Sequence, residues 1–153
     1  MNIVTVIGAI KTYLLALEWT STGTGKTKFN AVFTSNNWVH DEGYPFAVIN
    51  DNAQSGESLT NRHVKADTTI RISVCVHYGI IDKSEEDARI EEATLRIREA
   101  SEELKVKLNS YTFMNSINVD FVKDWSYGDI EMIEDINLLK RDFILNITEV
   151  IAR

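Results

Sequence analysis

A short segment of the chain matches the last residues of the phosphate-binding loop motif. It reads Gly23-Thr24-Gly25-Lys26-Thr27. A phosphate-binding loop needs Gly-x-x-x-x-Gly-Lys-Ser/Thr between a strand and a helix, so that the helix amides meet the phosphates. Here Thr20 occupies the position of the first glycine, and the patterns predict a helix before the segment and a strand after it. Because this order is inverted, we interpret the segment as a flexible polar turn.

Cys75 and His77 stand two residues apart in a predicted strand and therefore face the same side. Their Cα atoms would lie roughly 6–7 Å apart, and no third group orients the imidazole as a nucleophile–base pair requires. Neither His40 nor His63 stands at a spacing typical of a metal site. We predict a packed thiol and a surface imidazole. As the single cysteine, Cys75 also rules out an intramolecular disulfide.

Acidic residues cluster at Glu85-Glu86-Asp87 and Glu91-Glu92. Carboxylates stabilise the first turn of a helix, so we interpret the first cluster as a helix start capped near Ser84 and the second as a solvated face. Asn146-Ile147-Thr148 matches the glycosylation pattern but lies in a predicted strand, and we interpret it as a chance match. The sequence thus predicts no catalytic residue, no metal site and no cofactor, and we predict that the protein is not an enzyme.

Length, composition and net charge limit the kind of fold that can hold these residues. The chain has 153 residues, a net charge of −7 and 44% hydrophobic residues, which predicts one folded domain over residues 1–153. The acidic balance argues against a dedicated binder of the phosphate backbone. The apolar start, Met1 to Ile10, is shorter than the roughly 20 residues that span a bilayer, and no basic residue precedes it. We expect mature structure in a protein made in the cytoplasm.

Periodicity predicts the elements. Apolar residues at steps of three and four predict a helix over residues 2–18, and an acidic start with one apolar stripe predicts a second helix over about 84–109. Period-two alternation predicts strands over residues 28–35, 46–49, 68–78, 117–121 and 143–151. Residues 50–62 are predicted to be a polar loop, whereas residues 125–141 fit strand, helix or loop. This order predicts an α+β fold, a mostly antiparallel sheet of about five strands packed by two helices.

The tryptophans stand near the ends of predicted elements. Each of Trp19, Trp38 and Trp125 is either a partly covered core residue with a bonded indole N–H or part of a protein–protein contact. None of the candidate catalytic, nucleotide-binding or metal-binding motifs has the residues or the context that its chemistry needs. The long polar loops and the aromatic residues near element ends are typical of protein–protein contacts, so the sequence favours an assembly protein.

The order of features follows a recognisable plan over nearly the whole chain. An apolar N-terminal helix precedes Asp41-Glu42-Gly43-Tyr44-Pro45-Phe46-Ala47-Val48-Ile49, a glycine, an aromatic residue and a proline before an apolar strand. A Ser/Asn-rich loop, the strand Thr69-Ile70-Arg71-Ile72-Ser73-Val74-Cys75-Val76, an acidic-capped amphipathic helix and closing strands follow. This plan resembles the tail terminator, or tail-completion, proteins of long-tailed bacteriophages.

The resemblance implies a structural virion protein of the tail or neck. It implies a hexameric ring that binds the end of the tail tube, stops tube polymerisation and joins the tail to the head connector. The implied partners are copies of the chain, the tail tube protein and a connector or neck protein, with no membrane. Genomic DNA would pass through the lumen without specific binding, which an acidic protein suits because it repels phosphates.

We expect the interfaces in the loop 20–28, in the loop 50–62 and around Trp38. The candidate interface residues are Thr24, Lys26, Lys28, Trp38, Gln54, Ser55, Glu57, Leu59 and Arg62. Two alternatives stay open: another neck or connector assembly protein, and a small-molecule-binding enzyme of unrecognised family. An enzyme predicts a monomer or dimer with a ligand-dependent thermal shift, whereas assembly predicts a ring or a partner-dependent oligomer.

Overall fold

The computed structural model describes residues 3–20, 23, 25–59, 61–79, 82–110, 112–113, 115 and 121–152, and of residues 52–54, 121–123 and 150–152 the backbone alone. In this part of the chain the elements are α1 (Ile3–Ala16), β1 (Ala31–Phe33), β2 (Phe46–Ser58), β3 (His63–His77), α2 (Lys83–Lys107), β4 (Phe121–Tyr127), β5 (Glu131–Ile133), the 3₁₀ turn η1 (Glu134–Ile136) and β6 (Leu138–Ala152). The predicted α+β class is confirmed, and within the described residues the sheet has six strands instead of about five.

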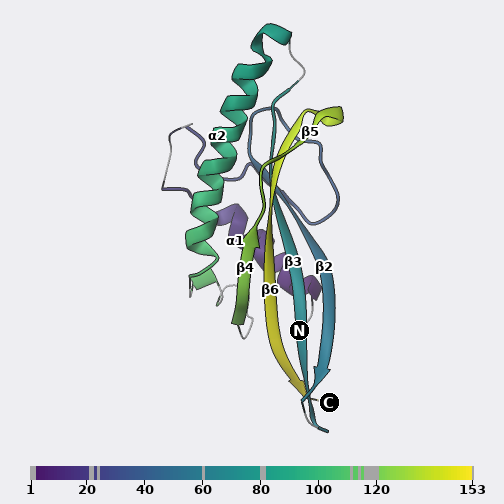
Figure 1. Cartoon of the computed structure of the whole chain (residues 1–153). Coiled ribbons are helices and arrows are strands. Elements are labelled where there is room, and N and C mark those ends of the chain that lie inside the picture. Colours follow the sequence, from purple (N-terminus) through teal and green to yellow (C-terminus); the bar gives the residue numbers. More distant parts are fainter. Residues whose placement is uncertain are drawn as a thin grey trace.

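The strands form one sheet in the order β1-β2-β3-β6-β4, and β5 pairs with the start of β6. All pairs are antiparallel except β1 and β2, which run parallel with Ala31 opposite Phe46. β3 and β6 are 15 residues long and pair along their whole length. They run through the middle of the molecule in Figure 1.

Both helices pack on one face of the sheet, where the strands present apolar side chains. In β3 the buried residues Ile70, Ile72, Val74 and Val76 belong to this face. The same core cluster contains Val6, Ile10 and Leu14 of α1 and Ala93, Ile97 and Leu104 of α2. Burying one such aliphatic side chain stabilises the fold by about 1.5–3 kcal/mol. The alternate residues of β3, among them Cys75 and His77, face the other side of the sheet.

The predicted loop over residues 50–62 is wrong. Residues 50–58 continue β2 and pair with β3 as far as Ser58 opposite Val64, and β6 continues along β3 until Ala152 lies opposite His63. Three strands therefore extend past both helices as an arm, which we define as residues 55–59, 61–67 and 148–152 (Figure 1). Successive residues of β2 are exposed there. With no helix above either face, the strand needs no apolar side, and its polar sequence resembles that of a loop.

Residues 125–141, which the sequence leaves open, hold the end of β4, then β5, η1 and the start of β6. Asn137 ends η1 in the left-handed region at φ 50° and donates its N–H to the carbonyl oxygen of Glu134. This tight reversal lays β5 alongside β6, with Ile133 opposite Leu138. The reversal matters for the site, since it places the side chains of β5 and η1 on the sheet face without helices.

Other element boundaries shift by a few residues. The two helices are confirmed but shorter than predicted, and α2 follows Asp82, not Ser84, as its N-cap, without a side-chain capping bond. The predicted strand 28–35 contracts to β1, the three residues that pair with β2. The predicted strand 117–121 lies outside the described residues apart from Phe121. No helix in the described part of the chain is long and apolar enough to cross a membrane.

Candidate functional site

The structure places the predicted interface residues in separate regions. Ser55, Glu57, Leu59 and Arg62 are exposed on the arm, with Leu59 and Arg62 at its tip. Gln54 belongs to β2, but its side chain lies outside the described residues. The arm thus brings four of the predicted residues together.

The glycine-rich turn forms a different region. Lys26 lies over the ring of Tyr44, with Nζ 3.7 Å from the ring centroid, and Lys28 is exposed. Thr24 lies outside the described residues. α1 precedes the turn and β1 follows it, which confirms the helix–turn–strand order. The turn therefore lacks the strand-to-helix context of a phosphate-binding loop.

Trp38 lines an apolar hollow on the sheet face that the helices leave open. The hollow has a volume of about 180 Å³, and its lining consists of Trp38, Ile133, Ile136, Leu138 and Lys140. Of the other two tryptophans, Trp19 is buried in the core with its indole N–H unbonded, and Trp125 donates its N–H to Asn109 at 2.7 Å.

A second hollow of about 220 Å³ continues past Ile136 and is lined in part by Val39, His40 and Asn137. We call the two hollows together the Trp38 groove. Val39 is 79% exposed and Ile136 is 41% exposed, and adjoining exposed apolar residues are typical of interaction sites. Each hollow is smaller than the roughly 300–1,000 Å³ of a small-molecule pocket. The groove therefore suits single side chains of a partner protein.

His77 joins the two walls of the Trp38 groove. Its Nδ1 lies 3.1 Å from the carbonyl oxygen of Ile136, and its Nε2 faces the carbonyl oxygen of Trp38. An imidazolium ring donates to both carbonyls, whereas a neutral ring has one N–H and donates to one. The ring is buried and stacks on Phe46 at 5.6 Å. The prediction of a surface imidazole is therefore wrong, because the loop before β2 and η1 fold over this end of β3.

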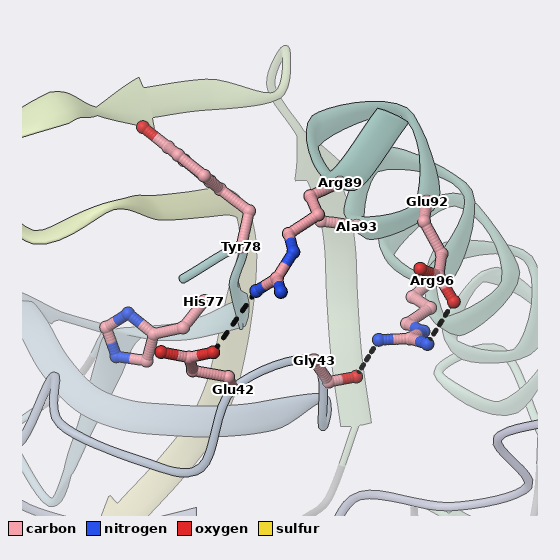
Figure 2. A pocket seen from close by; sticks show the side chains of 8 residues that line it. All are labelled: Glu42, Gly43, His77, Tyr78, Arg89, Glu92, Ala93 and Arg96. Atoms are coloured by element: carbon pink, nitrogen blue, oxygen red, sulfur yellow. Dashed lines mark hydrogen bonds and ion pairs between the residues drawn. The ribbon is translucent and has the colours of Figure 1, made fainter. Parts of the chain in front are cut away.

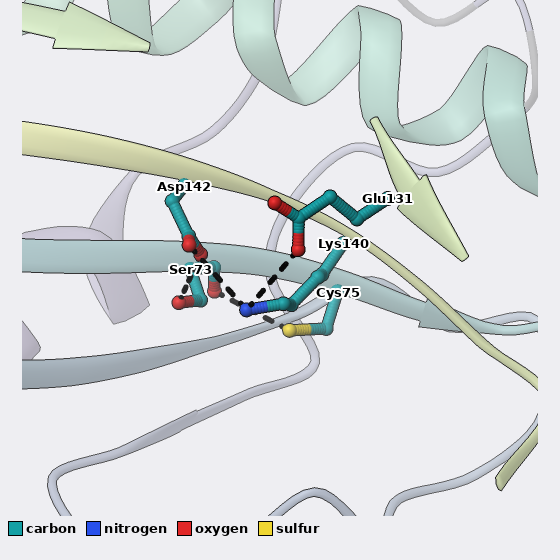
Figure 3. Close-up of polar contacts among 5 residues, drawn as sticks. All are labelled: Ser73, Cys75, Glu131, Lys140 and Asp142. Carbon is teal, nitrogen blue, oxygen red and sulfur yellow. Dashed lines mark hydrogen bonds and ion pairs between the residues drawn. The ribbon is translucent and has the colours of Figure 1, made fainter. Parts of the chain in front are cut away.

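Acidic residues surround the groove. The exposed ones nearest to it in sequence are Asp41, Glu42, Glu131, Glu134 and Asp135. The basic residue in the lining is Lys140, whose Nζ lies 3.7 Å from Glu131 and 3.4 Å from Asp142 (Figure 3). Because Glu131 and Asp142 compensate Lys140, and Arg89 lies 3.4 Å from Glu42, the negative charge beside the groove comes from Asp41, Glu134 and Asp135.

Cys75 lies behind Lys140 in the same polar cluster. Ser73 donates its Oγ–H to Asp142 at 2.6 Å, and the thiol of Cys75 donates to the carbonyl oxygen of Ser73 at 3.6 Å (Figure 3). Burial, and then the charge of Asp142, raise the pKa of the Cys75 thiol well above its ordinary value. The predicted packed thiol is confirmed. Because the sulfur stays protonated and His77 bonds to carbonyl oxygens, the two do not form a nucleophile–base pair.

We expect Cys75 to resist a chromogenic disulfide reagent in the native protein, because its sulfur is both buried and protonated. The reaction is expected to follow the unfolding rate and to complete at once in concentrated urea. A Leu59→Cys variant supplies the control, since its new thiol on the arm tip should react within the mixing time. Native Cys75 reacting as fast as that exposed thiol would contradict the assignment.

A third hollow, of about 290 Å³, lies between the loop before β2 and α2. Arg89 Nη1 lies 3.4 Å from Glu42, and Arg96 donates to the carbonyl oxygen of Gly43 and to the carboxylate of Glu92 (Figure 2). Both guanidinium groups thus already have partners in the chain. This arrangement is typical of a latch that holds the loop against the helix, not of a ligand site.

Gly43 permits this latch, and Gly43→Ala is expected to be costly. Gly43 has φ +74°, and a Cβ there would lie 2.5 Å from Arg96 Nη1. The left-handed backbone costs about 1–2 kcal/mol with alanine, and moving the end of the Arg96 side chain away from the carbonyl oxygen of Gly43 costs about 0.5–1.5 kcal/mol more.

The matched control is Gly25→Ala, because Gly25 has φ +76° with nothing within 4 Å of an added Cβ. Urea unfolding should show the larger loss for Gly43→Ala. Equal losses would mean that the backbone conformation alone accounts for the cost.

The sequence does not single out Ile133, Ile136 or the role of His77. Ile133 and Ile136 lie in the segment Asp129-Ile130-Glu131-Met132-Ile133-Glu134-Asp135-Ile136, where isoleucines recur every three residues, a spacing that does not decide between strand, helix and loop. Apolar residues interspersed with acids in this segment were the available signal for an exposed apolar patch. Within the described residues, no group of three or more His, Cys, Asp or Glu is placed to hold a metal ion.

No protein-family model matches the chain, and the search of curated proteins finds no relative. Two features of the chain bear on its function: an arm with an exposed tip, and an apolar groove with exposed acidic residues beside it.

Proposed function

We propose that this chain is a structural virion protein that caps the end of a phage tail tube as a hexameric ring. It stops tube polymerisation and joins the tail to the head connector or neck protein. The resemblance described above, carried by the order of elements and by the Gly43–Ile49 stretch, supports this function.

The observation that carries the proposal is the presence of two unlike surfaces at opposite ends of the molecule. A closed ring needs one patch on each subunit that meets a different patch on its neighbour. The arm is a projecting set of strands and the Trp38 groove is a hollow, and β3 runs from one to the other, with His63 beside the arm tip and His77 at the groove. Such a pair supports head-to-tail assembly.

The strands at the edges of the sheet also support assembly with other chains. β1 pairs with only the first three residues of β2, so in the described part of the chain residues 49–58 have no strand on their outer side. β4 forms the other edge. Uncovered strand edges are available for pairing with another chain.

The pairing of lysines on the sheet face without helices suits a protein that lets DNA pass without specific binding. Lysines on that face lie beside carboxylates, Lys65 at 3.9 Å from Asp67 and Lys140 at 3.4 Å from Asp142. Cations that are already paired release few counterions from DNA and therefore bind it weakly. The net charge of −7 also weakens DNA binding, because it repels the phosphates.

The proposal is tested by measuring the mass in solution by light scattering together with negative-stain imaging. We expect toroids of about six subunits, and capped, shorter tubes when the protein is added to polymerising tail tube protein. Its position in an assembled particle separates a tail terminator from a neck or connector protein. A protein that stays monomeric alone and beside the tube protein overturns the proposal, and a small-molecule thermal shift in that monomer would favour an enzyme.

A further inference from the structure

We propose that the arm tip of one subunit, formed by Leu59 with Arg62 and His63, seats in the Trp38 groove of the next subunit. This inference rests on the proposed ring and names the contact that closes it. The occupant of the groove is thus a second copy of this chain, bound head to tail.

The arm tip presents the side chain of Leu59 beside Arg62 and His63, and the exposed Glu57 lies two residues before the leucine. Leu59 is 48% exposed, and Arg62 and His63 are exposed beside it. The Leu59 N–H donates to the carbonyl oxygen of His63 at 3.1 Å, which closes the hairpin and holds the leucine at its end. The pairing of β3 with both β2 and β6 stiffens the arm, so little conformational entropy is lost when the tip binds.

The groove is complementary to this tip in size and charge. Its first hollow, of about 180 Å³, has room for one leucine side chain, and its lining is Trp38, Ile133, Ile136, Leu138 and the carboxylate-paired Lys140. Its rim carries exposed carboxylates, among them Glu134 and Asp135, which attract the guanidinium of Arg62. Opposite charges around a small apolar contact set its orientation and exclude other partners.

The length of β3 shows that the occupant must come from another molecule. His63 stands beside the arm tip and His77 forms the floor of the groove, and these are the two ends of a 15-residue strand. At the rise of a β-strand they lie about 45 Å apart. No subunit can therefore place its own tip in its own groove, and each subunit both offers a tip and receives one.

Cross-linking between introduced cysteines tests the contact. Leu59→Cys and Ile136→Cys are combined in one chain, and the assembled protein is treated with a short bismaleimide. The buried Cys75 remains unreactive. We expect a ladder of covalent oligomers from the double variant, no products from either single variant, and dimers alone from an equal mixture of the two single variants.

Charge reversal provides an independent measurement. Arg62→Glu should weaken assembly at least tenfold, and combining it with Glu134→Arg and Asp135→Arg should restore assembly. Toroids that give no ladder, or Arg62→Glu assembly that the reversed rim does not restore, overturn this contact and leave the ring standing. A double variant and a parent chain that are monomeric at every concentration overturn the ring, and the contact with it.

Discussion

Replacing Leu59 with aspartate is expected to dissociate the ring. The substitution puts a charge at the centre of an apolar contact and beside an acidic rim. Loss of a central interface side chain costs about 2 kcal/mol or more, which is roughly 30-fold in the affinity of each contact. Sedimentation or light scattering over a dilution series measures the change. A point substitution is preferable to deletion of the arm, because residues 46–58 also hydrogen-bond with β3.

Leu95→Asp is the matched control for this experiment. Leu95 is 45% exposed on α2, so the same charge is introduced at a leucine of similar exposure, away from both the arm and the groove. Both variants should keep their free energy of unfolding within about 0.5 kcal/mol of the parent. Equal dissociation of both variants, or of neither, would show that the tip of the arm carries no specific contact.

Replacing His77 with phenylalanine is expected to lower stability and assembly together. Phenylalanine keeps the packing against Phe46 but removes the ring nitrogens that face the carbonyl oxygens of Trp38 and Ile136. The loss of one such hydrogen bond costs about 1–3 kcal/mol. Because these two residues form the walls of the Trp38 groove, the groove loses its shape. Urea unfolding measures the first effect, and the mass in solution measures the second.

Phe46→Leu separates hydrogen bonding from packing in this region. It removes the ring that stacks on His77 but keeps the ring nitrogens of the histidine, and truncating this fully buried side chain costs roughly 1–3 kcal/mol because it leaves a cavity. We expect it to retain assembly when the concentration of folded protein is matched. If His77→Phe costs no more than Phe46→Leu and still assembles, the two hydrogen bonds do not hold the groove.

Local patterns predict the parts of the fold that have one apolar side. The alternation Ile70, Ile72, Val74 and Val76 predicts a half-buried strand, and that strand is the centre of the sheet. Steps of three and four likewise predict both helices to within a few residues. These predictions succeed because burial against a core imposes the period of the element on the sequence.

The same reasoning fails where no core imposes a period. Residues 50–58 are polar on both sides and resemble a loop, yet they are a strand because β3 supplies hydrogen-bond partners along their length. The candidate site divides in the same way into residues that the sequence indicates and residues that it does not. The polar segment 50–62 and the position of Trp38 draw attention to Leu59, Arg62 and Trp38. Ile133 and Ile136, in contrast, stand in a segment whose structure depends on pairing with β6.

Amino-acid order alone thus specifies an acidic α+β chain, with a packed thiol and no recognisable catalytic motif. Three further features come from the tertiary structure alone. These are the arm, the hydrogen bonds through which His77 joins Trp38 to Ile136, and the length of β3, which separates the arm tip from the groove. The physical reason is that a period reports whether a side chain is buried. Strand partners and chain reversals depend instead on contacts between residues far apart in the sequence, which a local pattern does not contain.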